Sequence, residues 1–317
     1  MDMREINDLR TWCVRKIAPG GVLRRQVKDS QAIRMTLAAA AAVCLGLLLV
    51  SPEIICAGKP VAFERKTKEA FAEYVRATEV RNDSELKRGD GLLWIDGLPE
   101  AERKRDYAEL ARGEVLMEQR KAFEPREFAC PGGMIHHWEG VIFVAGARVD
   151  DVLRVLEDYD HQAEYYAPDV ARSKIESREG DHFKVFLRFR RQKVITVVLN
   201  TEHEIDYFRD SATRAHSRSS ATHIAEVDNP GKWNEREKSR DQDNGFLWGM
   251  ETWWRVEEKD GGVYVQSEAL SLTRDIPAGL GWMIGPFITS IPKETLTFTL
   301  EATRKAVLAQ VRGKDSN

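Results

Sequence analysis

Residues 261–277 read GGVYVQSEALSLTRDIP, and residues 290–311, after a glycine-rich segment, read SIPKETLTFTLEATRKAVLAQV. In the first stretch, every second residue from Tyr264 to Arg274 falls on one face of a strand. In the second, apolar residues recur at helical spacing behind Pro292, a favoured residue in the first turn of a helix. Together they predict a last strand, a bend over residues 277–286, and one long C-terminal helix.

Upstream of this strand, the pattern from Gly133 onward changes to a strand, two short helices and then several more strands. Turn-rich or charged residues separate the strands. We expect strands at 137–147, 173–178, 183–192, 194–207, 214–227, 246–257 and 263–273, and helices at 149–159 and 162–166. This order predicts an α+β fold in which a curved antiparallel sheet of about seven strands wraps around the C-terminal helix and leaves a cavity beside it.

The element order, with residues 261–277 and the triplet Ser290-Ile291-Pro292, resembles the SRPBCC superfamily. That group includes START-type lipid carriers, polyketide cyclases and coenzyme Q-binding proteins. The resemblance implies a START-like helix-grip domain over residues 131–312, followed by a tail at 313–317. It implies a ligand cavity and names no ligand, because one fold carries many functions.

The N-terminal region contains an apolar run at residues 35–50, MTLAAAAAVCLGLLLV, with no charged residue. Basic residues precede it and small residues near Ala57 follow, which is the order of a secretory signal peptide. The alternative is a membrane anchor retained through residues 35–57. Residues 1–57 are therefore predicted to be a signal peptide or an anchor with a basic leader. Either one predicts a periplasmic or otherwise extracytoplasmic protein from residue 58 onward.

Residues 58–130 form a separate segment with helical spacing at 62–78 and 100–110, and they predict an α-rich extension of the main domain. The full chain has 48 Lys and Arg against 51 Asp and Glu, a formal net charge of −3. This balance shows no basic excess, so nucleic acid is not a predicted partner.

The motifs that carry common chemistries are missing from the sequence. There is no G-x-S-x-G elbow, no phosphate-binding loop and no H-E-x-x-H pair. His136 and His137 are adjacent on a predicted strand, so their side chains point to opposite faces and do not predict a metal site. We predict no catalytic residue, no metal ligand and no cofactor, and an enzyme is the less favoured class.

Aromatic and ionisable side chains on the predicted strands and the bend are the candidate ligand-binding residues. They are Trp253, Trp254, Glu268, Arg274, Trp282, His203 and Tyr207. For the aromatic residues the competing interpretation is a packed core, and for the polar ones it is structural pairing. The cavity is expected to be walled by Trp253 or Trp254 and the bend at 277–286.

The leading hypothesis is extracytoplasmic binding or transfer of an apolar small molecule, such as a lipid, quinone or polyketide-like compound. A second is a cyclase or hydratase in which His203 and Glu268 move protons in the same cavity. A third is an envelope assembly protein whose extension docks a partner.

Overall fold

The computed structural model describes the chain over residues 65–88, 91–123, 128–192, 195–240, 242–275 and 281–315. For residues 88, 281–289, 314 and 315 only the backbone is described. The contacts divide the chain into two units, residues 1–57 and 58–317, and all described residues belong to the second. The apolar run at 35–50 therefore lies outside the described residues.

The core of this unit is one antiparallel sheet in the order β1-β2-β9-β8-β6-β5-β4-β3, with β7 paired to β6. Its strands are β1 Leu116–Gln119, β2 Gly133–Ala145, β3 Val170–Glu179, β4 His182–Gln192, β5 Thr196–Arg209, β6 Arg214–Asp228, β7 Arg236–Glu237, β8 Gly249–Lys259 and β9 Gly262–Arg274. From β3 to β9 the long strands follow one another as a meander, and β2 pairs with β9 without a register shift. The first long strand is thus paired with the last one.

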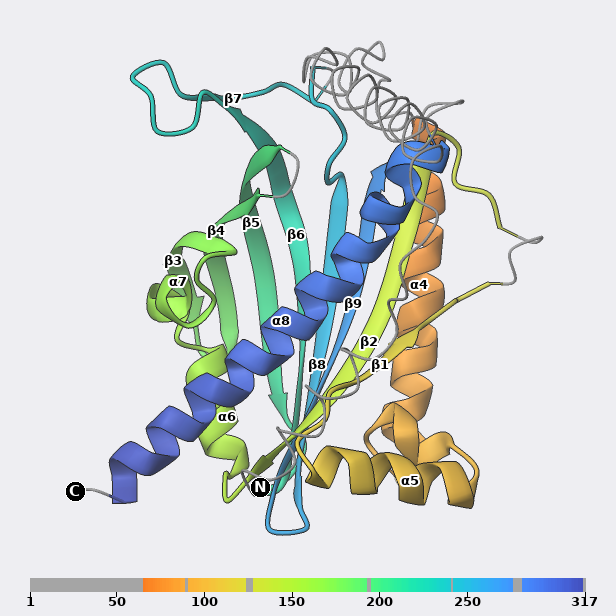
Figure 1. Cartoon of the computed structure of the whole chain (residues 1–317), viewed down its shortest axis with the longest axis vertical. Coiled ribbons are helices and arrows are strands. Elements are labelled where there is room, and N and C mark those ends of the chain that lie inside the picture. Colours follow the sequence, from red (N-terminus) through yellow and green to blue (C-terminus); the bar gives the residue numbers. More distant parts are fainter. Residues whose placement is uncertain are drawn as a thin grey trace, which may run out of the picture. The chain divides into compact units, whose positions relative to one another are not determined.

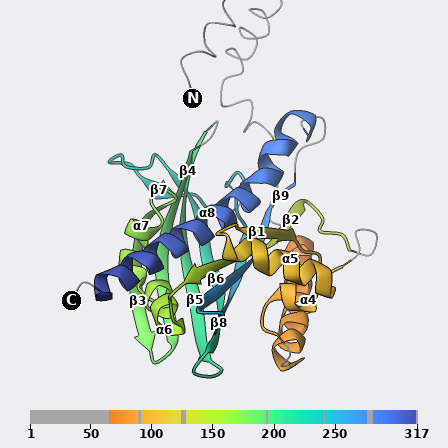
Figure 2. The ribbon, with the colours of Figure 1, turned by 60° about the horizontal axis from the view of Figure 1, so that its bottom comes forward.

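The helices divide between the two faces of this sheet. They are α4 Arg65–Arg88, the 3₁₀ helix η1 Trp94–Gly97, α5 Glu100–Ala111, α6 Val149–Leu156, the 3₁₀ helix η2 Tyr159–His161, α7 Gln162–Tyr165 and α8 Gly281–Asp315. Helix α8 crosses one face diagonally (Figure 1). In Figure 2, α4 and α5 gather beside β1 and β2, whereas α6 and α7 lie beside β3.

Helix α8 sits close to the sheet at Gly140 of β2. A Cβ atom at Gly140 would lie 2.5 Å from Cδ1 of Leu300 and 2.5 Å from Sδ of Met117. Only glycine leaves room for Leu300, whose side chain is fully buried. Leu300 belongs to the largest hydrophobic cluster, with the inward side chains of β2, β4 and β9 and those of α6. We call the sheet face under α8 the inner face.

The N-terminal extension covers the opposite, outer face. One cluster packs Leu93, Ile95 and Leu110 of the extension onto Val141 and Tyr264 of the sheet. A second packs side chains of α4 onto β8 and β9. Residues with even numbers on β9 therefore contact the extension, and those with odd numbers face α8, as the alternation along a strand requires.

The predicted α+β helix-grip class, the sheet and the α-rich extension are confirmed. The seven long strands match the predicted ones, and two short strands, β1 and β7, were not predicted. The predicted start of the last helix is wrong, because α8 begins at Gly281 and runs through Pro286 and Pro292. A proline inside a helix costs about 3 kcal/mol, so each of these prolines locally favours a break in the helix. Packing of the rest of the helix against the sheet can offset this cost.

We expect Leu300→Ala to lower the free energy of unfolding by about 2 to 5 kcal/mol, because the side chain is fully buried between α8 and the sheet. Urea denaturation measures the change. Glu301→Ala, at the exposed neighbouring position, is the control and should change stability by less than about 0.5 kcal/mol. Equal effects of the two substitutions would show that α8 is not gripped by the sheet.

Candidate functional site

A row of four side chains crosses the inner face near its middle. Ser217 of β6 lies opposite Trp254 of β8, and Trp254 lies opposite Ser267 of β9. Tyr207 of β5 extends the row, since it is opposite Ser217. Directly opposite residues in an antiparallel pair share a face, and Ser267 is also opposite Gly140, which meets α8. The row therefore lies on the face that α8 covers.

The two serines of this row are buried without a hydrogen-bond partner. Ser217 is 2% exposed and Ser267 is fully buried, and among the described residues neither hydroxyl finds a partner. Trp254, between them, is only partly buried and packs against the main cluster. Buried hydroxyls are nearly always hydrogen-bonded, so this indole with a hydroxyl on either side differs from an ordinary packed core.

His203 lies on the same face of β5 as Tyr207. Its Nε2 is 2.9 Å from Oγ1 of Thr201 and its Nδ1 is 3.4 Å from Oγ of Ser219. Burial lowers the pKa of His203 to about 4, so the imidazole is neutral at neutral pH. At neutral pH the His203 ring therefore acts only as a hydrogen-bonding group. No carboxylate among the described residues is hydrogen-bonded to it.

Tyr207 is held by the fold. Its hydroxyl is 2.6 Å from that of Tyr159 and donates to the carbonyl oxygen of Leu156 at 3.1 Å. Burial raises the pKa of Tyr207 well above its usual range. The Tyr207 side chain holds η2 and the end of α6 against β5. Its hydroxyl already makes hydrogen bonds within the protein.

Glu268 and Trp253 belong to the outer face. Trp253 is opposite Glu268 in the sheet and packs with Tyr74, Val75 and Leu270 beneath α4. It is the neighbour of Trp254 in the chain and points the other way. Of the two tryptophans, only Trp254 can wall a space beside α8.

Glu268 is an ion-pair partner of the extension. Its carboxylate is 2.5 Å from Nε2 of His137 and pairs with Arg81 of α4. Burial alone would raise the pKa of Glu268, but the hydrogen bond and charge of His137 and the charge of Arg81 lower it. The pairing of His203 with Glu268 considered for an enzyme is excluded, because the sheet separates the two side chains.

Of the two remaining predicted residues, only Arg274 has a described side chain. Arg274 ends β9 on the outer side, where its backbone N–H donates to Gly245 at 2.7 Å and its Cβ lies close to that glycine. The side chain of Trp282 lies outside the described residues. The structure thus brings Trp254, His203 and Tyr207 to one face and places Trp253, Glu268 and Arg274 on the other.

A buried charged cluster between α4 and the sheet was not predicted. Arg255 of β8 pairs with Glu85 at 2.8 Å, and Arg120 pairs with Glu139 at 3.2 Å. Burial and the nearby charge of Glu268 raise the pKa of Glu139, although arginines oppose the shift. The alternation along each strand predicts that its charged residues share one face of the sheet. No sequence pattern indicates which charged residues of the extension pair with them.

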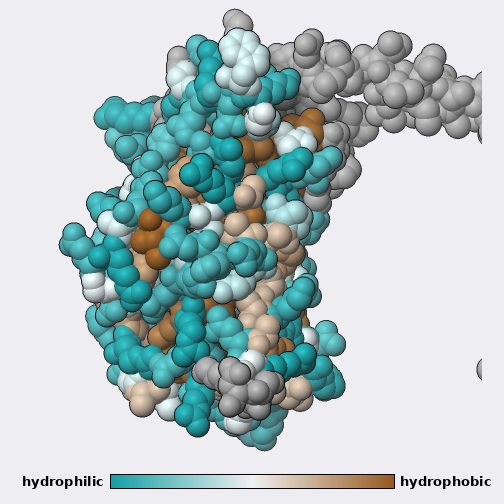
Figure 3. Space-filling model, turned by 90° about the vertical axis from the view of Figure 1, so that its left-hand side faces the viewer, coloured by the Kyte–Doolittle hydropathy of each residue, from teal (hydrophilic) through white to brown (hydrophobic). Residues whose placement is uncertain are grey.

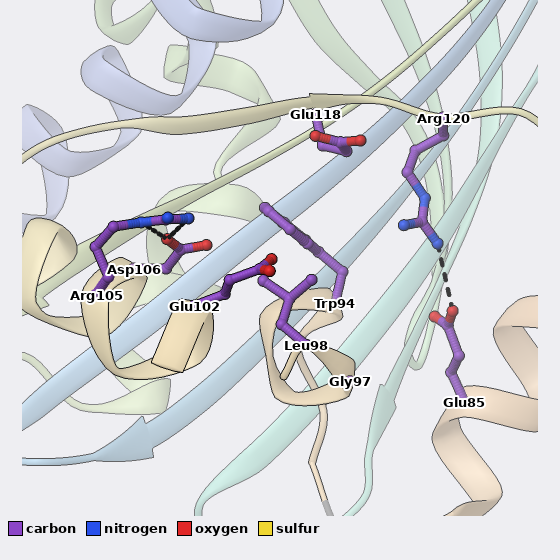
Figure 4. A pocket seen from close by; sticks show the side chains of 9 residues that line it. All are labelled: Glu85, Trp94, Gly97, Leu98, Glu102, Arg105, Asp106, Glu118 and Arg120. Atoms are coloured by element: carbon purple, nitrogen blue, oxygen red, sulfur yellow. Dashed lines mark hydrogen bonds and ion pairs between the residues drawn. The ribbon is translucent and has the colours of Figure 1, made fainter. Parts of the chain in front are cut away.

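A polar pocket of about 410 Å³ adjoins this cluster on the outer face. Its lining residues are Glu85, Trp94, Gly97, Leu98, Glu102, Arg105, Asp106, Glu118 and Arg120. Figure 4 shows Arg105 held by Asp106 and Arg120 directed to Glu85, with Trp94 between the two pairs. A second pocket, of about 380 Å³, lies along the exposed side of α8. Both differ in place from the predicted cavity, and the side chains of its predicted wall at 277–286 lie outside the described residues.

Two further features of the described residues bear on function. No group of three or more His, Cys, Asp or Glu side chains among them is arranged to hold a metal ion. Within the same ranges, no helix combines the length and apolar character needed to cross a membrane.

The architecture of the sheet closed on α8 is the helix-grip fold that the SRPBCC resemblance implies. No family model matches the sequence, and no curated protein matches it. Solved structures with similar folds include a STAR-related lipid transfer protein from Xanthomonas axonopodis, which is 17% identical with a TM-score of 0.39 and is aligned over 60% of this chain and 98% of that chain.

Two other solved structures are similar at the same level. Human STARD10 is 10% identical, with a TM-score of 0.39 over 69% of this chain and 84% of that chain. The Zhui aromatase/cyclase from Streptomyces is 15% identical, with a TM-score of 0.35 over 56% of this chain and 94% of that chain. At these identities and TM-scores the similarity concerns the fold and says nothing about the ligand of this chain.

We expect His203 to make the protein less stable as the pH falls from 6.5 to 4. The unfolded chain binds a proton at this residue near pH 6.5, and the folded protein only near pH 4, so acid favours the unfolded state in this interval. His203→Asn should lack this dependence. The stability of wild type relative to the variant should fall by about 2 to 3 kcal/mol between pH 7 and pH 4.

Urea denaturation at several pH values measures this difference. His161→Asn is the control, because the hydrogen bond and charge of Asp158 raise the pKa of exposed His161 and reverse the sign of its effect. A pH-independent difference between wild type and His203→Asn would show that His203 is not buried as a neutral side chain.

Proposed function

We propose that the helix-grip domain binds an apolar small molecule on the inner face, beside α8. The observation that carries this proposal is Trp254, partly exposed between the buried, unpartnered hydroxyls of Ser217 and Ser267. Ligand sites in proteins are mostly apolar and carry a few placed polar groups. This row has that composition, and a lipid, quinone or polyketide-like molecule is the class that it suits.

Binding is better supported than catalysis. A general acid or base must lie within hydrogen-bond reach of the group it serves and needs a suitable pKa. His203 is neutral and bonded to Thr201, and the carboxylate of Glu268 lies behind the sheet. The titratable pair that does meet on the inner face is Tyr207 and Tyr159, whose hydroxyls are 2.6 Å apart. Burial raises the pKa of both, so neither is a general base near neutral pH.

We further propose that residues 58–317 act outside the cytoplasm. The support is the charge-free run at 35–50 behind basic residues, which is the pattern of a signal peptide or an N-terminal anchor. An apolar ligand and an envelope location fit together, since a poorly soluble molecule needs a carrier to leave a membrane.

The ligand proposal predicts different effects of two adjacent substitutions. Residues 58–317 should bind the apolar fluorophore N-phenyl-1-naphthylamine at one competable site. Trp254→Ala should weaken this binding at least about tenfold, equivalent to about 1.4 kcal/mol, because its indole faces the ligand. Trp253→Ala is the matched control and should weaken binding by less than about threefold, since its indole packs beneath α4.

Fluorescence titration measures the affinities, and circular dichroism checks that each variant is folded. Equal losses for the two variants would argue against a site on the inner face. Absence of any saturable binding by the wild type would contradict the proposed function itself.

The location predicts that alkaline phosphatase fused after Gly58 is active in the native host, because this reporter needs export. The same fusion without residues 1–57 should be inactive. N-terminal sequencing of the exported protein then distinguishes cleavage near Ala57 from a retained anchor. Activity that does not depend on residues 1–57 would refute the export proposal.

A further inference from the structure

The segment that follows β6 forms a fixed turn. Asn229 and Gly231 adopt positive φ angles of 52° and 78°. The N–H of Lys232 donates to Asn229 at 3.0 Å, and the N–H of Glu235 donates to Lys232 at 3.0 Å. The Glu235 carboxylate accepts from the N–H of Gly231 at 2.6 Å and pairs with Arg188 of β4. We call residues 229–235 the Trp233 turn.

The Trp233 turn holds its tryptophan in solvent. Trp233 is 97% exposed, and the described residues make no ring or cation contact with it. The next most exposed large apolar residues are Val80, on α4, and Phe208, whose ring stacks on His216 at 4.7 Å. A rigid turn that presents a whole indole to solvent places 150 to 250 Å² of surface, roughly, where a partner can cover it.

The turn lies at the end of the sheet where β9 ends and α8 begins. β6 ends at Asp228, and the last strand ends near the start of α8, at the same end of the antiparallel sheet. Figure 1 shows β7 with its loop and the start of α8 at this end. Exposure of the inner face toward this end is mixed: Trp138 and Ser219 are partly exposed, whereas Thr201 and Ile224, on the strands that lead to the turn, are buried.

The surroundings of the turn fit a lipid surface better than a protein partner. The side of the molecule with β3, α7 and β7 is largely hydrophilic, and its hydrophobic side chains form separate patches (Figure 3). A protein interface is centred on several apolar side chains. A lone indole beside Lys232 is instead typical of the bilayer interface, where tryptophan sits at headgroup depth and lysine extends to the water.

We propose that the Trp233 turn inserts into the interface of a phospholipid bilayer and holds the end of the sheet where α8 begins against lipid. The contact rests on the proposed function in one respect: a protein that carries an apolar ligand has a reason to bind a membrane. Its geometry, an exposed indole on a fixed turn, is independent of that function.

The test uses the full chain in vesicles of phosphatidylcholine with or without bromine on the acyl chains. Bromine quenches only those tryptophans that enter the bilayer. Trp233→Phe should remove most of the bromine-dependent loss of tryptophan fluorescence, because Trp233 is the indole that the proposal places in the bilayer. Trp94→Phe is the control, because Trp94 belongs to the extension on the outer face, and it should leave the loss unchanged.

A bromine-dependent loss that is the same in wild type and Trp233→Phe would overturn the membrane contact, as would an equal reduction in Trp94→Phe. Binding of N-phenyl-1-naphthylamine by residues 58–317 is measured without lipid, so it reports on the inner face alone. If the membrane contact fails and fluorophore binding is intact, the proposed function stands and the membrane contact is overturned. If the membrane contact is found and fluorophore binding is absent, only the proposed ligand site is overturned.

Discussion

The close contact of α8 with the sheet at Gly140 is the constraint on which the rest of the structure depends. Leu300 occupies the space that a side chain at residue 140 would fill, so α8 can approach the backbone of β2. That approach buries the inward side chains of the sheet in one hydrophobic cluster with α6 and α8. It also fixes which face of each strand is inner, and therefore which side chains can meet a ligand.

The sheet separates two different chemistries. On the inner face, neutral hydroxyls, an imidazole and aromatic rings accompany the apolar core, and burial keeps His203 uncharged. On the outer face, paired charges join α4 to β2, β8 and β9. The adjacent residues Trp253 and Trp254 show the division directly, since one supports the extension and the other faces α8. The alternation of side chains along a strand is sufficient to produce this division between the two faces.

The sequence predicted the elements whose signals are local. The seven long strands and the closing helix follow from alternation and helical spacing, and they were found. The start of α8 was misplaced because Pro286 and Pro292 signal a bend locally. The site was predicted only in part, since strand patterns show that Trp253 and Trp254 face opposite ways but not which one faces α8. Glu268 was assigned to the ligand because its partner Arg81 is 187 residues away.

The pairing of β2 with β9, and of Arg81 with Glu268, also determines when the fold can close during synthesis. A ribosome releases the chain from its N-terminus, so α4 and β2 emerge long before β9 and α8. Contacts between distant segments slow folding and leave strand edges exposed in the interval. Until β9 is complete, β2 has no partner on that edge and the charges of α4 stay in water. The sheet and its hydrophobic core therefore stay incomplete until β9 and α8 have both been synthesised.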